Sequence, residues 1–490
     1  MKSLRSGHGG ALAAQTAQRL RVMIDAGSYA PGEVVPSLRR LAGEWEISPA
    51  TAVHAYQRLV DEGVLVNLPR IGYRVLAVPS QRRIDGCSLT PREPTPAAIG
   101  DLQLNFLRDC ERLPCGFLGT AHPDPDLLPI RELQGWVRRC LREDPGCGLD
   151  YRIGAGDLGL RRQIARRYGM RGRRAAVDDI IITNGCSEAL TLALRTICAP
   201  GDVVAVESPT FFNHLRILEL LRLRVIEIPI DPRAGLDPAQ LDLVLQRHQV
   251  KALLSVPVLH NPLGVSLTAE RQRDILAICD RHGVSVVEDV IYVGLGTATG
   301  RPPLYRDHPA IVPVLTCGSV SKVLAPGWRI GWILGGALSE RILHAKVVSS
   351  LGSPSLHQQA LAGFLASNGE RTVLKRAAHV YRERLHTGRA LIMRHFPRGT
   401  RCSEPDGGMV LWVELPEGVP VDRLYRQAIA EGLCFAPGYI FGVHVQHQRN
   451  LRLCVSRLHG QARDAIARIG QLATSLAARS RSLSGIDDRG

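Results

Sequence analysis

The stretch GSVSK at residues 318–322, with APGWRIGW at residues 325–332, decides the fold of this 490-residue chain. Lys322 can form a Schiff base with an aldehyde when its neighbours lower its pKa. Ser319 and Arg329 are predicted to contact one phosphate, because the forked donors of arginine suit that role. Taken alone, the stretch also fits an exposed lysine in a serine-rich loop.

A second motif, TNGCSEAL at residues 183–190, directly follows an apolar run typical of a buried strand. Gly185 allows the backbone to approach a phosphate closely. The N–H groups of Cys186 and Ser187 lie where a helix begins, and the positive end of a helix favours anions. A simple glycine-serine helix cap is the alternative interpretation.

Three more motifs follow apolar runs in the same way: ESPTFF at 207–212, HNPLG at 260–264 and EDVIY at 288–292. Phe211 offers an aromatic face to a flat ring. Asn261 and Tyr292 can both reach a phenolate oxygen, and Asp289 can pair with a protonated ring nitrogen. Each of these residues alone also fits core packing, a common turn or a surface carboxylate.

In this order the motifs resemble fold-type I proteins of the aminotransferase class I and II family, over about residues 115–470. The resemblance implies an α/β fold with large and small subdomains and pyridoxal 5'-phosphate (PLP) attached to Lys322. It also implies that Tyr151, in DYRIG at 150–154, reaches the phosphate of a neighbouring subunit. Arg452, in NLRL at 450–453, would hold the carboxylate of an amino compound, although a structural arginine on a strand remains open.

The segment 12–78 has the pattern of a small DNA-binding unit. Apolar spacing predicts helices over 12–26, 38–45 and 49–62, with Ser37 and Ser48 as N-caps. Two strands are expected over 64–67 and 73–78, joined by a turn at 69–72. Helix, helix, turn, helix and hairpin is the order of a winged helix-turn-helix.

This segment resembles the GntR family of DNA-binding domains, with an unrelated small helical domain as the alternative. It departs from the common pattern at Pro49, which leaves few side chains to read bases. The residues expected at the DNA are Ser37, Arg39, Arg40, Ser48, Thr51, His54, Gln57, Arg58, Arg70 and Gly72. Ser37, Arg39, Arg40 and Arg70 are the expected phosphate contacts, and Thr51, His54, Gln57 and Arg58 the base readers.

The expected organisation is a DNA-binding domain at 1–78, an extended linker at 79–101, a PLP-binding domain at 102–477 and a disordered polar tail at 478–490. The net charge of +15 suits a polyanionic partner. No apolar run is long enough for a membrane span, and no signal peptide is apparent, so we expect a cytoplasmic protein. Twelve scattered cysteines indicate reduced thiols, and no metal site is expected, since His444 and His447 fit a surface loop.

A GntR-type domain followed by an aminotransferase-like domain resembles the MocR subfamily of regulators. The resemblance implies a homodimeric transcription regulator that binds a double-stranded DNA operator. In it, a PLP aldimine would sense PLP or an amino compound and modulate operator binding. The alternative is an active aminotransferase, because the catalytic set looks complete. The sequence leaves open the turnover, the effector, the operator and the direction of regulation.

Overall fold

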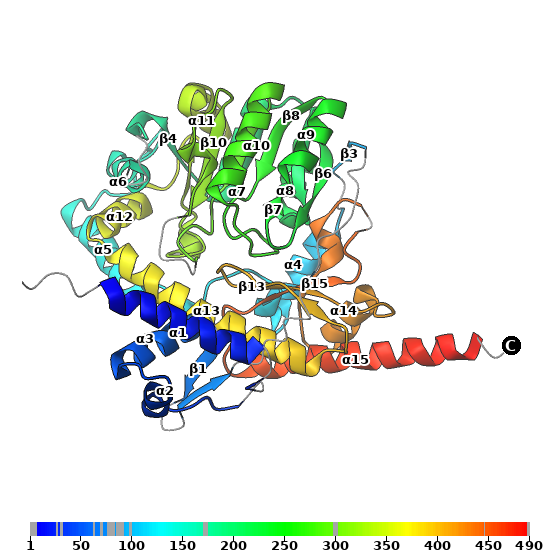
Figure 1. The fold of residues 1–490 in the computed structure, drawn as a ribbon. Coiled ribbons are helices and arrows are strands. Elements are labelled where there is room, and N and C mark those ends of the chain that lie inside the picture. Colours follow the sequence, from blue (N-terminus) through cyan, green and yellow to red (C-terminus); the bar gives the residue numbers. More distant parts are fainter. Residues whose placement is uncertain are drawn as a thin grey trace, which may run out of the picture. The chain divides into compact units, whose positions relative to one another are not determined.

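The computed structural model describes residues 7–25, 28–29, 33–61, 64–68, 72–75, 84, 93–97, 100–169, 175–296, 302–444 and 446–487. The chain divides into two compact units, Met1–Arg82 and Arg83–Gly490. Figure 1 shows the ribbon of the chain with its elements labelled. None of the described helices is both long enough and apolar enough to cross a membrane.

The N-terminal unit has the winged helix-turn-helix order that the sequence predicts. Its elements are α1 (Gly7–Asp25), α2 (Leu38–Glu44), α3 (Pro49–Asp61), β1 (Leu65–Leu68) and β2 (Gly72–Val75). β1 and β2 pair antiparallel, with Leu65 opposite Val75. Leu20, Leu41 and Leu59, one from each helix, meet in one apolar core. The interior of the unit is therefore built by all three helices and the hairpin.

Two helix caps fix the start of α2 and α3. The Ser37 hydroxyl accepts a hydrogen bond from the Arg40 N–H at 3.3 Å, and Ser48 accepts one from the Thr51 N–H at 3.1 Å. Both predicted caps are confirmed. The Tyr56 hydroxyl donates to the Pro36 carbonyl at 2.7 Å, which ties α3 to the turn before α2.

The second unit, called the body here, is built on a nine-stranded sheet. Its strands are β3 (Thr95–Pro96), β4 (Ile180–Thr183), β5 (Val203–Ser208), β6 (Arg224–Asp231), β7 (Gly235–Leu236), β8 (Val250–Ser255), β9 (Ser285–Asp289), β10 (Val314–Ser319) and β11 (Gly331–Leu334). The order is β3-β6-β5-β8-β9-β10-β11-β4, with β7 beside β6. Strands β6, β5, β8, β9 and β10 run parallel, whereas β11 is antiparallel to both of its neighbours.

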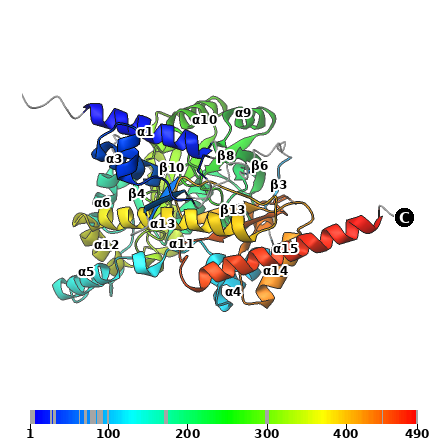
Figure 2. The same cartoon turned by 60° about the horizontal axis from the view of Figure 1, so that its bottom comes forward.

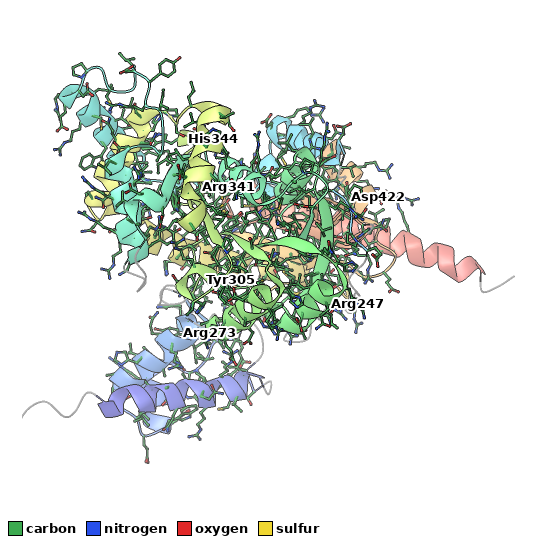
Figure 3. The ribbon with its side chains drawn as sticks, turned by 90° about the horizontal axis from the view of Figure 1, so that it is seen from above. Arg247, Arg273, Tyr305, Arg341, His344 and Asp422 are labelled. Carbon is green, nitrogen blue, oxygen red and sulfur yellow. The ribbon has the colours of Figure 1, made fainter. Side chains whose placement is uncertain are left out.

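Helices cover both faces of this sheet, which explains why its strands are apolar at nearly every position. Val204, Leu254 and Val287 pack with residues of α7 (Cys186–Ile197), α8 (Phe212–Leu220) and α11 (Ser339–Ser350). Ala205 and Val286, on the opposite face, pack with α9 (Pro238–Arg247) and α10 (Ala269–His282). Arg341 and His344 mark α11 in Figure 3, and Arg247 marks the end of α9.

A second sheet forms the small subdomain of the body. Its strands are β12 (Arg401–Cys402), β13 (Val410–Glu414), β14 (Ala436–Pro437) and β15 (Asn450–Cys454), in the antiparallel order β12-β13-β15-β14. α13 (Gly369–His395) and α15 (Gln461–Asp487) pack side by side against it (Figure 2). The remaining body helices are α4 (Leu102–Arg112), α5 (Ile130–Glu143), α6 (Leu158–Gly169), α12 (Ser355–Ala366) and α14 (Val421–Ala430).

Two sequence expectations about the ends of the body are wrong. Thr95 and Pro96 form β3, which pairs antiparallel with β6, so part of the predicted linker belongs to the body sheet. The guanidinium of Arg224 also donates to the Pro94 carbonyl at 2.8 Å. At the other end, α15 continues to Asp487, so the described part of the predicted disordered tail is helical.

Candidate functional site

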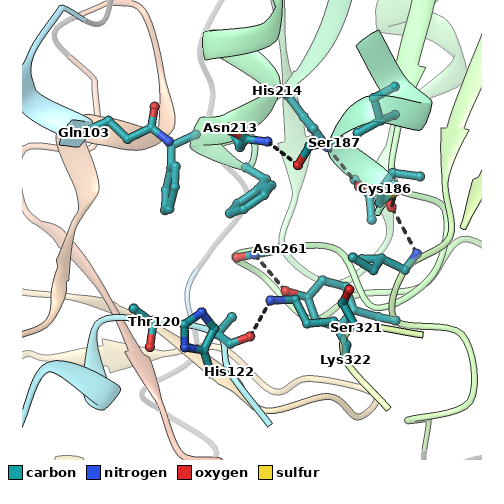
Figure 4. Close-up of a pocket in the computed structure, with 18 of the residues that line it drawn as sticks. Gln103, Thr120, His122, Cys186, Ser187, Asn213, His214, Asn261, Ser321 and Lys322 are labelled. Atoms are coloured by element: carbon teal, nitrogen blue, oxygen red, sulfur yellow. Dashed lines mark hydrogen bonds and ion pairs between the residues drawn. The ribbon is translucent and has the colours of Figure 1, made fainter. Parts of the chain in front are cut away.

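The five body motifs meet at one edge of the large sheet. Each follows the carboxyl end of β4, β5, β8, β9 or β10, the edge where α/β sheets place their ligand sites. A cavity of about 240 Å³ lies there (Figure 4). The predicted residues that line it are Cys186, Ser187, Phe211, Asn261, Asp289, Tyr292, Lys322, Arg329 and Arg452.

Lys322 carries the amine of the cavity. Its Nζ donates to the Ala121 carbonyl at 2.6 Å. Burial and, after it, the positive charge of Arg452 lower the pKa of Lys322 to about 8. A much larger fraction of this amine is therefore neutral near pH 7.5 than of an ordinary lysine, and a neutral amine is the form that attacks a carbonyl.

Asp289 is fixed by three contacts at the end of β9. His214 Nε2 lies 3.1 Å from Asp289 Oδ2, while the Ile291 N–H and the Cys186 thiol donate to Oδ1 at 3.0 and 3.4 Å. Thr210 Oγ1 lies 3.3 Å from the other ring nitrogen of His214. The carboxylate is thus held in one orientation and still borders the cavity.

Asn261, Tyr292 and Arg452 form a continuous hydrogen-bonded row. Asn261 Nδ2 donates to the Tyr292 hydroxyl at 3.0 Å, and Arg452 Nη1 donates to Asn261 Oδ1 at 2.9 Å. Arg452 Nη2 donates to the Gly119 carbonyl at 2.5 Å. Burial raises the pKa of the Tyr292 hydroxyl, so Tyr292 remains a hydrogen-bond donor at neutral pH.

Arg452 is fully buried, yet its Nε has no hydrogen-bond partner among the described residues. A buried guanidinium with an unpaired donor next to a cavity is suited to an anionic ligand group. The structure is therefore compatible with both interpretations of Arg452. The residue is a buried arginine on β15, and it also lines the cavity.

The phosphate end of the predicted site lies where α7 begins. Gly185 precedes the helix with φ of 85°, and a Cβ atom there would lie 2.3 Å from Arg329 Nη2. Only glycine leaves room for this arginine. Arg329 donates to Ser321 Oγ at 3.2 Å, and Asn213 Nδ2 donates to Ser187 Oγ at 3.1 Å. The guanidinium of Arg329, the hydroxyl of Ser187 and the start of α7 therefore lie at the same end of the cavity, where the helix N-terminus favours an anion.

Three predicted contacts do not line the cavity. The first is Gly185, which precedes α7 as its N-cap. Ser319 is buried and its hydroxyl donates to the Ile330 carbonyl at 2.7 Å, so it supports the loop instead of lining the pocket. Ser321, two residues on, lines the cavity in its place. Tyr151 is 77% exposed and does not line the cavity of its own chain.

Sequence reasoning missed several lining residues: Gln103, Thr120, His122, Asn213, His214 and Ser321. His214 lies on α8 two residues beyond the ESPTFF motif, and its role depends on the fold that brings it to Asp289. Gln103 comes from α4, which no motif marks. For Ser321 a signal existed, because it lies inside the quoted GSVSK stretch.

In the N-terminal unit, the exposed face of α3 carries His54, Gln57 and Arg58 at spacings of three and four residues. Thr51 does not belong to this face. It is 7% exposed, and its hydroxyl lies 2.8 Å from that of Ser48, so its prediction as a base reader is wrong.

Among the predicted phosphate contacts, Ser37 and Arg39 are exposed, and Arg40 pairs with Glu44 at 2.6 Å. Gly72 begins β2 with φ of 109°, a conformation that favours glycine. Arg70 lies outside the described residues.

Two family descriptions match the chain. Aminotransferase class I and II matches residues 149–469, and the gntR family of bacterial regulatory proteins matches residues 12–75. The chain is 33% identical over 453 residues to the uncharacterized HTH-type transcriptional regulator YjiR of Escherichia coli. That alignment covers 91% of this chain and 96% of YjiR.

Solved structures match the body. The α-aminoadipate aminotransferase LysN of Thermus thermophilus, complexed with N-(5'-phosphopyridoxyl)-L-leucine, is 28% identical with a TM-score of 0.69, covering 77% of this chain and 95% of LysN. The kynurenine aminotransferase of Pyrococcus horikoshii, in complex with PMP, is 25% identical with a TM-score of 0.71, covering 78% and 95% of the two chains.

Proposed function

Because the chain belongs to the aminotransferase class I and II family and carries a gntR-family domain in front of it, we propose that it is a transcription regulator that binds PLP. The amino-terminal unit binds an operator, and the body pocket senses PLP or an amino compound. One observation carries this proposal: a complete set of PLP-type side chains converges on one cavity in a chain that begins with a winged helix-turn-helix.

The cavity residues fit this cofactor. PLP supplies an aldehyde that reacts with amines and a ring that withdraws electrons. Lys322 would provide the amine, and Asp289, held by His214, would accept a hydrogen bond from the ring nitrogen and keep it protonated. Arg329, Ser187 and the start of α7 would hold the phosphate.

The remaining polar residues act on the phenolate oxygen and on the ligand. Asn261 Nδ2 donates a hydrogen bond to the Tyr292 oxygen, so the Tyr292 hydroxyl can donate its own proton to the phenolate oxygen of the ring. Arg452 Nε is available for the carboxylate of an amino acid. An amino acid that reacts at the cofactor would place its carboxylate beside Arg452. The pocket would then hold a negative charge that it lacks with the cofactor alone.

A subunit interface is the third part of the proposal. Leu149, Tyr151 and Ile153 are 86%, 77% and 64% exposed in the single chain. A run of large apolar side chains on the surface is typical of a contact site. We place these residues in a homodimer interface, with Tyr151 directed to the phosphate of the partner's cofactor.

The most direct test of the proposed function is selection of bound DNA from a random pool by the full-length protein, with and without PLP. Enrichment of one sequence motif, at a level that depends on PLP, supports a regulator. A pool that stays random under both conditions would exclude operator recognition by this protein.

A second candidate function is transamination, and the lowered pKa of Lys322 favours it together with the intact Asp289, Tyr292 and Arg452 set. Incubation of the PLP-loaded protein with amino acids and 2-oxo acids distinguishes the two functions. Multiple turnovers per chain indicate an enzyme, whereas a single exchange at most indicates a sensor.

A further inference from the structure

Gln103 is a buried amide for which the proposed chemistry has no role. It is 4% exposed and lies on α4, the first helix of the body. Its Oε1 has no hydrogen-bond partner among the described residues, although it lines the cavity. Figure 4 shows the side chain extending from α4 toward the wall that carries Asn213. Buried polar atoms in folded proteins are normally paired, so this amide indicates an absent partner.

Aromatic contacts connect α4 with the residues around Arg452. Phe106, one turn along α4, has its ring 5.6 Å from that of Phe212. The guanidinium of Arg452 lies 5.8 Å from the same Phe212 ring. Gln103, Phe212 and Arg452 all line the cavity, so a ligand whose carboxylate meets Arg452 shares this small space with Gln103.

Each charged residue that lines the cavity already has a role in the proposed function. Asp289 is paired with His214, Arg329 lies at the phosphate end and Arg452 serves the carboxylate. Burial, followed by the charge of Lys322, lowers the pKa of His122 to about 4, so this ring is neutral at pH 7. Among the described lining residues, no ionised group remains for a second charge on the ligand.

We propose that Gln103 recognises an uncharged hydrogen-bonding group on the side chain of an amino-acid effector. The effector is then a neutral polar α-amino acid, whose carboxamide or hydroxyl donates to Gln103 Oε1. A side-chain carboxylate could accept a hydrogen bond only from the amide nitrogen of Gln103 and would leave this oxygen unpaired. An apolar side chain leaves it unpaired as well, which is costly for a buried group. This inference rests on the proposed function, because it assumes an amino acid in the PLP pocket.

The test uses full-length, PLP-loaded protein and follows amino-acid binding by visible absorbance and by calorimetry. The ligands are L-asparagine and L-glutamine, with L-aspartate, L-glutamate and L-leucine as charged and apolar counterparts. We expect at least one carboxamide to bind about tenfold or more tightly than its carboxylate counterpart and than L-leucine.

Two substitutions isolate the role of Gln103. Gln103→Leu should remove the preference for the carboxamide over L-leucine. Gln103→Glu keeps the size and adds a charge, and it should shift the preference toward L-lysine, which joins the ligand set for this variant. Asn105→Leu makes the same chemical change at an exposed position of α4 and should leave the ranking as in the wild type.

The outcomes separate this inference from the proposed function. If amino acids change the absorbance but charged or apolar ones bind best, or if the Gln103 variants keep the wild-type ranking, the inference is wrong and the sensing proposal stands. If no amino compound alters the spectrum of a PLP-loaded protein, amino-acid sensing fails and this inference fails with it.

Discussion

Lys322 and Arg452 are two cations at one cavity, and this arrangement sets the chemistry of the site. Burial and the charge of Arg452 both favour the neutral form of the lysine. Arg452 itself cannot release its proton, because a guanidinium stays charged at all physiological pH values. The site therefore separates two tasks, with a nucleophilic amine at Lys322 and a permanent positive charge at Arg452.

The first prediction concerns the pH dependence of PLP capture by Lys322. The reactive form is the neutral amine, so the rate should rise from pH 6 and level off above about pH 8, instead of near 10.5. Rapid-mixing absorbance measurements on apoprotein check this. Borohydride treatment and peptide mapping should place the label on Lys322, and Lys322→Ala should lose it. A labelled peptide without Lys322 would exclude the assignment.

The second prediction concerns Asp289. Asp289→Asn keeps the size but removes the charge that holds the protonated ring nitrogen. We expect PLP to bind still, while its reaction with amino acids slows by about 10- to 100-fold, the range of one charge-assisted hydrogen bond. Stopped-flow absorbance gives the rate, with circular dichroism as a control for folding. An unchanged rate would show that the Asp289 charge has no role in this reaction.

The sequence predicts which residues form the site where these residues lie inside a motif. It does not predict those that only the fold brings to the site from elsewhere in the chain. Lys322, Asp289 and Asn261 follow strand ends, and parallel strands carry such residues to one edge. His214 and Gln103 come from helices with no motif. Thr51 was misjudged because its burial depends on how α3 packs.

At the scale of elements, β3 changes the geometry of the connection between the two units. Its pairing with β6 attaches the chain to the body from about residue 94. Ile84 is also buried in the apolar core of the body, only 8% exposed. The connection between the two units is therefore much shorter than the predicted linker 79–101, which does not act as one extended spacer over its whole length.

The third prediction separates the roles of α2 and α3. Arg39→Ala should weaken binding to all DNA sequences alike and reduce the slope of log K against log salt by about one. His54→Ala and Gln57→Ala should change the preferred sequence, because both lie on the exposed face of α3. Anisotropy titrations at several salt concentrations measure both effects.

Arg247→Ala is the matched control for this experiment. It removes the same charge from an exposed position on α9 of the body and should leave slope and preference unchanged. If Arg39→Ala behaves like Arg247→Ala, Arg39 makes no phosphate contact.

At the scale of the whole molecule, the class of fold could be predicted but the full topology could not. Apolar runs at 180–182, 203–206 and 284–287 indicate buried parallel strands because helices cover both faces. The antiparallel strand β11 begins at Gly331, at the end of the APGWRIGW stretch, and continues to Leu334, so the motif concealed its start. β3 begins beside Pro94 and ends at Pro96, a composition that favours a linker by local rules.

The fourth prediction concerns the assembly. Sedimentation at micromolar concentration should give two chains per particle. Tyr151→Phe removes only a hydroxyl from an exposed side chain. It should keep the dimer and weaken PLP binding by about tenfold, the effect of one lost hydrogen bond to a charged group. A stable monomer with tight PLP binding would contradict the shared site.

The measurement that tests the central claim most directly is the affinity of the full-length protein for its selected operator, taken with PLP, without PLP and in Lys322→Ala. We predict that PLP changes the wild-type dissociation constant by about tenfold or more, a coupling in the range usual for allosteric proteins. The Lys322→Ala protein should bind the operator with one affinity under both conditions. If PLP occupies the wild-type pocket and the operator affinity stays the same, the pocket does not regulate DNA binding and the account is wrong.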